Sequence, residues 1–376
     1  NVYCRPLLHF PHNYNYVSRE TMYRWFNQHL KLGFDETPAE GDFRLLTTEE
    51  TTIWDEKHPT PPGGLEYELS LTKYLAEQSD KQIAAVTPTN AAGLSKFDEV
   101  VGTAFRTIIG RDRPKHDDID RKKVEKQEGA GYLYFKDILR LKTRGEEFPI
   151  VSFYPTSTRW NGDVVIWVDG RGKAGILDDT GRPAPAVQRL LDGGASVVAA
   201  DLFQQGEFLG GGQNITDQRV VGNPREFAGY TYTYNDTLFV HRVHDVLTLI
   251  TYIKDDEHAP KRVNLVGFNG AGPIVAAARA ICGADINRAA VDSAGFRFSS
   301  LKSYRDPQFV PGAVKYGDIP SLLALSAPHS LWVGGEAAAD VKVTTQTYAA
   351  AEASRKLTVH EPSNAYEAAV GWLMEK

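Results

Sequence analysis

The feature that most limits the fold of this chain is an alternation, from residue 123 onward, of short apolar runs with amphipathic or Ala-rich stretches. The runs at 164–168 and 196–200 are apolar at nearly every position, which is typical of strands buried on both faces of a parallel sheet. Strands that alternate with helices predict an α/β architecture. The expected strands are 123–128, 132–143, 148–154, 164–168, 196–200, 263–266, 289–291, 331–333 and 357–359. The expected helices beyond residue 123 are 185–191, 238–254, 273–282, 320–325, 345–354 and 366–374.

One of these strand-to-helix junctions, VNLVGFNGAGP at residues 263–273, has the layout of a nucleophile elbow. In the elbow motif G-x-S-x-G, a sharp turn holds a serine hydroxyl at the end of a sheet. Here Asn269 replaces the serine, and the last glycine is displaced to Gly272. An amide nitrogen is not a nucleophile at neutral pH. Since Asn tolerates left-handed backbone geometry, the turn itself is expected to persist.

The position of this turn, after the fifth core strand, predicts the α/β-hydrolase fold, a mainly parallel sheet flanked by helices. In this fold the catalytic triad follows the chain order nucleophile, acid, base. Glu336 and Asp340 follow the expected strand 331–333, so either could be the acid, and His360 ends the last strand near the position of the base. Strand ends collect polar residues in any open parallel sheet, so a structural role stays open for each. If they are remnants of a triad, their side chains should point towards Asn269.

A binding cleft is expected beside Asn269. The residues that follow the expected strand 164–168 lie where an oxyanion loop is usual, and backbone N–H groups there could face a developing negative charge. Another acidic residue, Glu207, lies beyond the end of the strand expected at 196–200. The predicted binding residues are Asp169, Gly170, Arg171 and Glu207. If the elbow proves inert and the chain is active, Ser293 is the first alternative nucleophile to consider.

The N-terminal segment carries a second histidine of interest. Residues 16–32 have apolar side chains at three- and four-residue spacing and predict a helix. His12 lies between this helix and a short strand expected at 6–10, as a catalytic base does at the end of a hydrolase domain. Two interpretations stay open. Residues 1–35 are either the tail of a preceding hydrolase domain with His12 as its base, or an N-terminal extension that packs on the domain that follows.

The rest of the domain organisation follows from composition along the chain. Residues 36–64 are polar and rich in Pro and Gly, which predicts a linker. The hydrolase-like domain is expected at 65–376, with a helical start at 65–115. The chain begins Asn1-Val2-Tyr3 without an initiator Met, for which a processed form or a fragment is the expected explanation.

Composition excludes several classes of partner. A formal net charge of −6 gives no reason to expect nucleic acid or an anionic membrane surface. No apolar run approaches the roughly 20 residues needed to span a bilayer. Cys4 and Cys282 are too few and too far apart to predict a disulfide framework or a metal site. No phosphate-binding loop, dinucleotide fingerprint or metal-ligand spacing is convincing, so no cofactor and no metal are expected.

Several stretches resemble a known family. These stretches are FPHNYNYVSRETMYRWFNQHL, YNDTLFVHRVHDVLTLITYI, VGFNGAGP, DSAGFRF and VPGAVKYGDIPSLLAL. They are similar to bacterial proteins described as acetyl xylan esterase-like α/β-hydrolases, and the resemblance covers nearly the whole chain. Its most specific parts are PHNYN and PGAVKYG. Longer members look like tandem hydrolase modules. The resemblance therefore implies that His12 matches the base of an upstream module, while Asn269 occupies the nucleophile position of the downstream one.

The resemblance implies a carbohydrate-esterase-like hydrolase, with ester hydrolysis by a serine triad expected of the full-length parent. The implied substrate is an acylated carbohydrate or another small ester, the implied partner is an upstream hydrolase module, and the implied compartment is secreted or periplasmic. The alternative is a non-catalytic hydrolase-fold module that binds a glycan or braces a partner domain. The two hypotheses are compatible if the parent is tandem.

Overall fold

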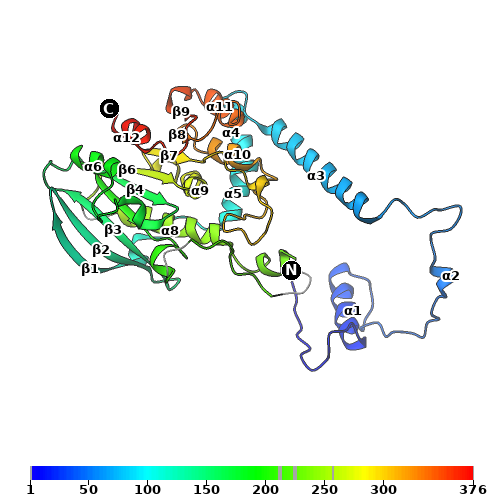
Figure 1. The fold of residues 1–376 in the computed structure, drawn as a ribbon. Helices are drawn as coiled ribbons and strands as arrows, with labels where there is room; N and C mark the ends of the chain where they lie inside the picture. The colour runs from blue at the N-terminus through cyan, green and yellow to red at the C-terminus, as the bar shows by residue number, and fades with distance from the viewer. Residues whose placement is uncertain (1, 211–213, 223–226, 256–257, 376) are drawn as a thin grey trace. The chain divides into compact units, whose positions relative to one another are not determined.

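The structure is a computed structural model that describes residues 2–210, 214–222, 227–255 and 258–375 (Figure 1). The chain divides between Glu68 and Leu69 into two compact units. This division falls inside helix α3 (Gly64–Val86), four residues beyond the end of the linker expected at 36–64.

The first unit is built around helix α1 (Tyr16–Leu30). The helix begins where the Asn15 side chain accepts a hydrogen bond from the backbone N–H of Ser18, at 3.1 Å. No residue of α1 is buried. The expected linker contains a one-turn helix, α2 (Thr48–Thr51). The strand expected at 6–10 is wrong: the chain turns there, and no described strand of this unit could pair with it.

The second unit contains a nine-stranded sheet in the order β1-β2-β3-β5-β4-β6-β7-β8-β9. The first three strands and β5 pair antiparallel, whereas β5, β4 and β6 to β9 form a parallel array. Every strand expected from residue 123 onward is present, so the mainly parallel α/β sheet is confirmed. The strands are β1 (Ile119–Gly129), β2 (Tyr132–Leu141), β3 (Glu146–Pro155), β4 (Asp163–Asp169), β5 (Ser196–Ala200), β6 (Arg262–Phe268), β7 (Arg288–Asp292), β8 (Ser330–Gly334) and β9 (Leu357–His360).

Helices cover both faces of this sheet. In Figure 1, α6 and α12 lie over one face, and α8 and α9 lie over the other, with α5 packed on α8. The helix expected at 345–354 ends instead at Ala350, since Glu352 adopts a φ of +54° that a helix cannot continue. The helices are α4 (Ala91–Phe97), a π-helical turn (Asp98–Gly102), α5 (Thr103–Ile109), α6 (Pro185–Asp192), α7 (Gly229–Tyr232), α8 (Leu238–Lys254), α9 (Gly272–Cys282), α10 (Asp318–Ala324), α11 (Lys342–Ala350) and α12 (Tyr366–Met374).

Strand β4 shows why the central runs are apolar throughout. Val164 and Ile166 belong to the core beneath α8 and α9, whereas Val165 and Trp167 belong to the core beneath α6 and α12. Because alternate side chains point to opposite faces and both faces are covered, the strand has no position for a polar residue between its two ends, Asp163 and Asp169. The carboxyl ends of the parallel strands meet at one edge of the sheet, where Asp169, Asn269 and His360 lie.

Candidate functional site

The corner at Asn269 has the predicted geometry. Strand β6 ends at Phe268, Asn269 has a φ of +52°, Gly270 has a φ of +87°, and α9 begins at Gly272. A side chain at Gly272 would place its Cβ 1.9 Å from the backbone oxygen of Asp292 on β7, so only glycine lets the helix start this close to the sheet. The left-handed strand-to-helix corner is confirmed.

The side chain of Asn269 is hydrogen-bonded at both of its ends. Its Nδ2 donates to Oδ1 and Oδ2 of Asp169, at 3.0 and 2.9 Å, and its Oδ1 accepts from the Tyr366 hydroxyl at 3.0 Å. Asp169 ends β4 and is 1% exposed, and Tyr366 begins α12. The structure thus joins two predicted residues, Asn269 and Asp169, with Tyr366, which the sequence analysis missed. Burial raises the pKa of Tyr366, which keeps its hydroxyl a hydrogen-bond donor.

The loop after β4 is committed to internal hydrogen bonds. The N–H of Gly170 donates to the Phe268 carbonyl at 3.1 Å, and the N–H of Arg171 donates to Asp169 Oδ1 at 2.9 Å. The N–H of Lys173 donates to Asp201 Oδ1 at 2.8 Å. These three N–H groups are therefore already used within the fold and are not available to an oxyanion.

The predicted binding residues otherwise divide into two groups. The Arg171 guanidinium donates to Asp169 at 3.1 Å, and this partner raises the pKa of Arg171. Glu207, whose side chain is 70% exposed, instead forms an ion pair with Lys173 at 2.7 Å. Lys173 also contacts the buried carboxylate of Asp201. Arg171 thus belongs with Asn269, whereas Glu207 belongs to a cluster that ties the loops after β4 and β5 together.

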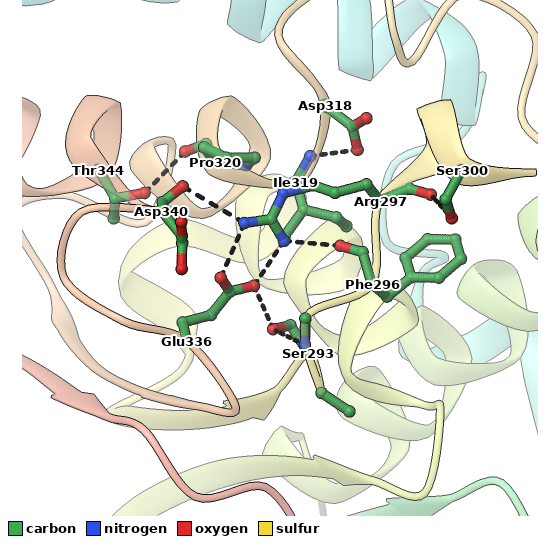
Figure 2. Close-up of polar contacts among 12 residues, drawn as sticks. Ser293, Phe296, Arg297, Ser300, Asp318, Ile319, Pro320, Glu336, Asp340 and Thr344 are labelled. Atoms are coloured by element: carbon green, nitrogen blue, oxygen red, sulfur yellow. Dashed lines mark hydrogen bonds and ion pairs between the residues drawn. The ribbon is translucent and has the colours of Figure 1, made fainter.

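The first predicted acid, Glu336, is bound to a different set of residues (Figure 2). Its carboxylate is 2% exposed and receives hydrogen bonds from Arg297 at 2.6 and 2.7 Å and from the Ser293 hydroxyl. The second, Asp340, is exposed, and its backbone carbonyl accepts from Arg297 at 3.3 Å. Ser293 is buried and donates to a carboxylate that is already paired with Arg297, so this cluster is arranged as a structural ion pair.

His360 ends β9, as predicted, but its ring lies against Trp332, with the ring centres 5.3 Å apart. Within the described ranges, no hydrogen bond joins His360 to Asn269, Glu336 or Asp340. The carboxylate that senses its charge is Asp292, at the end of β7. Burial raises the pKa of Asp292, and the nearby His360 opposes that rise. The side chains predicted as acid, base and elbow residue therefore do not form a connected triad.

His12 lies in the first unit, exposed, in the segment that leads into α1. The serine that His12 would activate belongs to the expected upstream module, so the role of His12 as a base stays a prediction.

A cavity of about 610 Å³ lies next to the Asn269 network. Its wall includes the apolar residues Trp167 and Leu177 and the polar residues Arg171, Asn364 and Tyr366. Tyr366 stacks on Trp167, with the ring centres 6.1 Å apart and the planes at 14°. The described side chains that could hold a metal ion gather elsewhere, around the start of α8.

Comparison with known proteins agrees with the fold. No family model and no curated relative matches the chain. A structure from Bacteroides fragilis, described as a provisional acetyl xylan esterase, has a TM-score of 0.56 at 14% identity, over 72% of this chain and 75% of the other. A methylesterase structure has a TM-score of 0.52 at 16% identity, over 79% of this chain and 67% of the other. No helix among the described residues is long and apolar enough to cross a bilayer. The chain therefore has the α/β-hydrolase fold, which it shares with structures described as esterases.

Proposed function

We propose that this chain is a carbohydrate-esterase-like hydrolase module whose own elbow is not catalytic, and that the cavity beside Asn269 binds acylated carbohydrate. The observation that carries this proposal is the pair of contacts that Asn269 makes with Asp169 and Tyr366. An amide in the nucleophile position cannot be acylated, and here it also links the ends of β4, β6 and α12. The position that a serine hydroxyl would need has become part of the scaffold.

The surroundings of the elbow support the same reading. A serine nucleophile needs a base within hydrogen-bond reach and an acid that orients the base. Glu336 is paired with Arg297, and His360 packs on Trp332. In our proposal, a corner without a histidine hydrogen-bonded to Asn269 among the described residues has the shape of an elbow but not its chemistry.

The cavity offers features that suit a sugar. The rings of Tyr366 and Trp167 line the cavity, where the apolar face of a pyranose can pack, and Arg171 and Asn364 offer donors to hydroxyl or acyl oxygens. An apolar wall with a few polar groups is typical of a small-ligand site. Binding of a glycan or its ester is therefore the activity that this module retains in our proposal.

A second function concerns the parent protein. Helix α1 buries none of its residues, and Phe26 and Leu30 are 44% and 61% exposed. A helix whose apolar side chains are not buried within its own unit needs a partner surface, and in our proposal that surface belongs to a preceding hydrolase domain, with His12 as its catalytic base. The parent would then carry the serine triad and would work on esters in the secreted or periplasmic compartment that the family resemblance implies.

Activity is tested with 4-nitrophenyl acetate. The chain is expected to match a protein-free blank, because loss of the serine nucleophile lowers kcat by about 10⁶ in a well-studied protease. Asn269→Ser is expected to show no labelling by a fluorophosphonate, because no histidine among the described residues is hydrogen-bonded to residue 269. Robust hydrolysis that survives Asn269→Ala would overturn the non-catalytic elbow.

Binding is tested by calorimetric titration with acetylated xylo-oligosaccharides. Tyr366→Ala is expected to weaken binding at least tenfold. Tyr234→Ala, which removes a tyrosine that is 90% exposed and outside the cavity wall, is the matched control. Equal affinities for the two variants would contradict a site at the cavity.

A further inference from the structure

Three side chains with metal-ligating atoms meet at the start of α8. Asp236 lies in the loop before the helix, and His241 and His244 lie three residues apart on it, so that they share one face. One ligand atom from each of the three lies within 4.8 Å of the other two. Two imidazoles and a carboxylate form a donor set that suits first-row divalent cations.

The hydrogen bonding of His244 favours metal binding. Its Nε2 lies 2.7 Å from the backbone oxygen of Ile109, and since a carbonyl can only accept, Nε2 carries the proton. The lone pair is then on Nδ1. His244 is 2% exposed, and in the part of the chain that the structure describes its Nδ1 has no hydrogen-bond partner. A buried acceptor without a partner is unfavourable. Histidines that bind a metal through one ring nitrogen commonly donate the N–H of the other to a backbone carbonyl, as His244 does here.

The other two residues open onto a cavity of about 520 Å³. Asp236 and His241 lie in its wall, together with Phe203, Gln218 and Thr231. The charge of Arg111 acts on His244, and Arg111 is neutralised by Glu146, with which it makes hydrogen bonds of 2.8 and 3.0 Å. A cation between the three side chains would therefore meet no uncompensated positive charge from Arg111, and one side of it would face the cavity.

We propose that Asp236, His241 and His244 form a binding site for a first-row divalent cation such as Zn²⁺, with its remaining position open to the cavity. Ligand atoms around tetrahedral Zn²⁺ lie roughly 3.4 Å apart, which follows from bonds of about 2.1 Å. The ligand atoms now lie within 4.8 Å of one another, so their separations need to shorten only slightly around a metal ion. The exposed side chain of Asp236, which lies in a loop, can move by this amount. This site is independent of the function proposed for the elbow.

The experiment uses the tag-free full chain, stripped with EDTA and dialysed. ZnCl₂ is titrated against the protein in competition with a chromogenic chelator, and CoCl₂ is used to record visible absorption from low-coordinate Co²⁺. We expect one equivalent of Zn²⁺ to bind, with a rise in Tm. His241→Ala and Asp236→Asn change residues that are not buried, so both are expected to fold and to bind Zn²⁺ at least tenfold more weakly.

His360→Ala is the matched control, because it removes a histidine outside the cluster. Retention of full Zn²⁺ affinity in this variant, with loss in His241→Ala, would support the site. Less than one tenth of an equivalent bound by the parent chain would overturn it. Equal Zn²⁺ affinity in the parent chain, His241→Ala and Asp236→Asn would also overturn it, by placing the metal elsewhere. Circular dichroism of each variant separates loss of binding from loss of folding.

Discussion

Asn269 and Asp169, which are 100 positions apart in the sequence, are joined by two hydrogen bonds from one amide nitrogen to both oxygens of one buried carboxylate. The pair connects the carboxyl ends of β6 and β4, which are neighbours in the sheet. In an active elbow this position must stay free to attack a substrate. Here the Asn269 amide donates to a buried carboxylate that would otherwise have fewer hydrogen-bond partners.

Asn269→Asp tests this relationship. The change places a second carboxylate against Asp169, and like charges this close cannot both ionise without cost. We expect a loss of about 2–4 kcal/mol in the free energy of unfolding at pH 8 and a smaller loss at pH 5, where one carboxyl group can hold a proton. Urea denaturation at the two pH values measures both. Asn269→Ala, which removes the hydrogen bonds without adding charge, should show no such difference between them.

Gly170→Ala tests the close approach of the loop to the elbow. A Cβ at residue 170 would lie 1.8 Å from the backbone oxygen of Asn269, so one of the two turns must move. We expect a loss of about 3 kcal/mol or more, or a failure to accumulate folded protein. Gly210→Ala is the control, because a Cβ there meets no atom within 4 Å. If Gly170→Ala melts at the parent temperature, the described packing of the corner is wrong.

Removing the charge of Glu336 should destabilise the fold, whereas removing the charge of Asp340 should not. Glu336→Gln breaks a buried ion pair with Arg297, and because the Arg297 side chain is 22% exposed we expect a loss of about 2–3 kcal/mol. Asp340→Asn alters an exposed side chain and should stay within about 0.5 kcal/mol of the parent. Thermal unfolding of both variants measures this contrast. Similar values for the two variants would show that Glu336 is not a structural residue.

A pH dependence is expected from Asp245, in α8. Burial raises its pKa to about 7 from an ordinary value of 3.8. Between these values the folded protein holds a proton that the unfolded chain has released, so this group makes the protein less stable as pH rises. Burial lowers the pKa of His244 to about 4, which acts in the opposite direction below pH 6.5.

The difference in the free energy of unfolding between Asp245→Asn and the parent isolates the contribution of Asp245 from that of His244. We expect the variant to gain stability relative to the parent as pH rises from 4 to 7, by on the order of 3 kcal/mol, and to gain no more above pH 8. An offset that is the same at every pH would contradict this prediction. Denaturant titrations at pH 4.5, 6 and 8 measure it.

The two cysteines should differ in reactivity. Cys4 is exposed, and Cys282 is buried at the end of α9, where burial raises the pKa of its thiol to about 12. Because the thiolate is the reactive form, we expect one thiol per chain to react with Ellman's reagent in the native protein and two after unfolding. Cys4→Ser should remove the native signal. Two rapidly reacting thiols in the folded parent would contradict the packing of α9.

The sequence by itself predicted the strands and the elbow corner, because both depend on local chemistry. The interior of a strand such as β4 is apolar because both of its faces are covered. A short run of apolar residues therefore predicts a strand that is buried on both faces. The corner could be predicted because Asn and Gly are the residues that accept positive φ. Where a run had no partner strand, as at 6–10, the local pattern misled, since a strand needs a neighbour for its backbone hydrogen bonds.

Only the tertiary structure decided which side chains meet. The strand order, with β5 placed between β3 and β4, and the return of α12 over the sheet bring Tyr366 to Asn269 from 97 positions away. Likewise, Glu336 pairs with Arg297 rather than with a histidine, because the loop after β7 passes beside the loop after β8. Residue type and position along the chain place a polar group at a strand end. Its partner depends on crossovers and rotamers, which no local pattern of residues specifies.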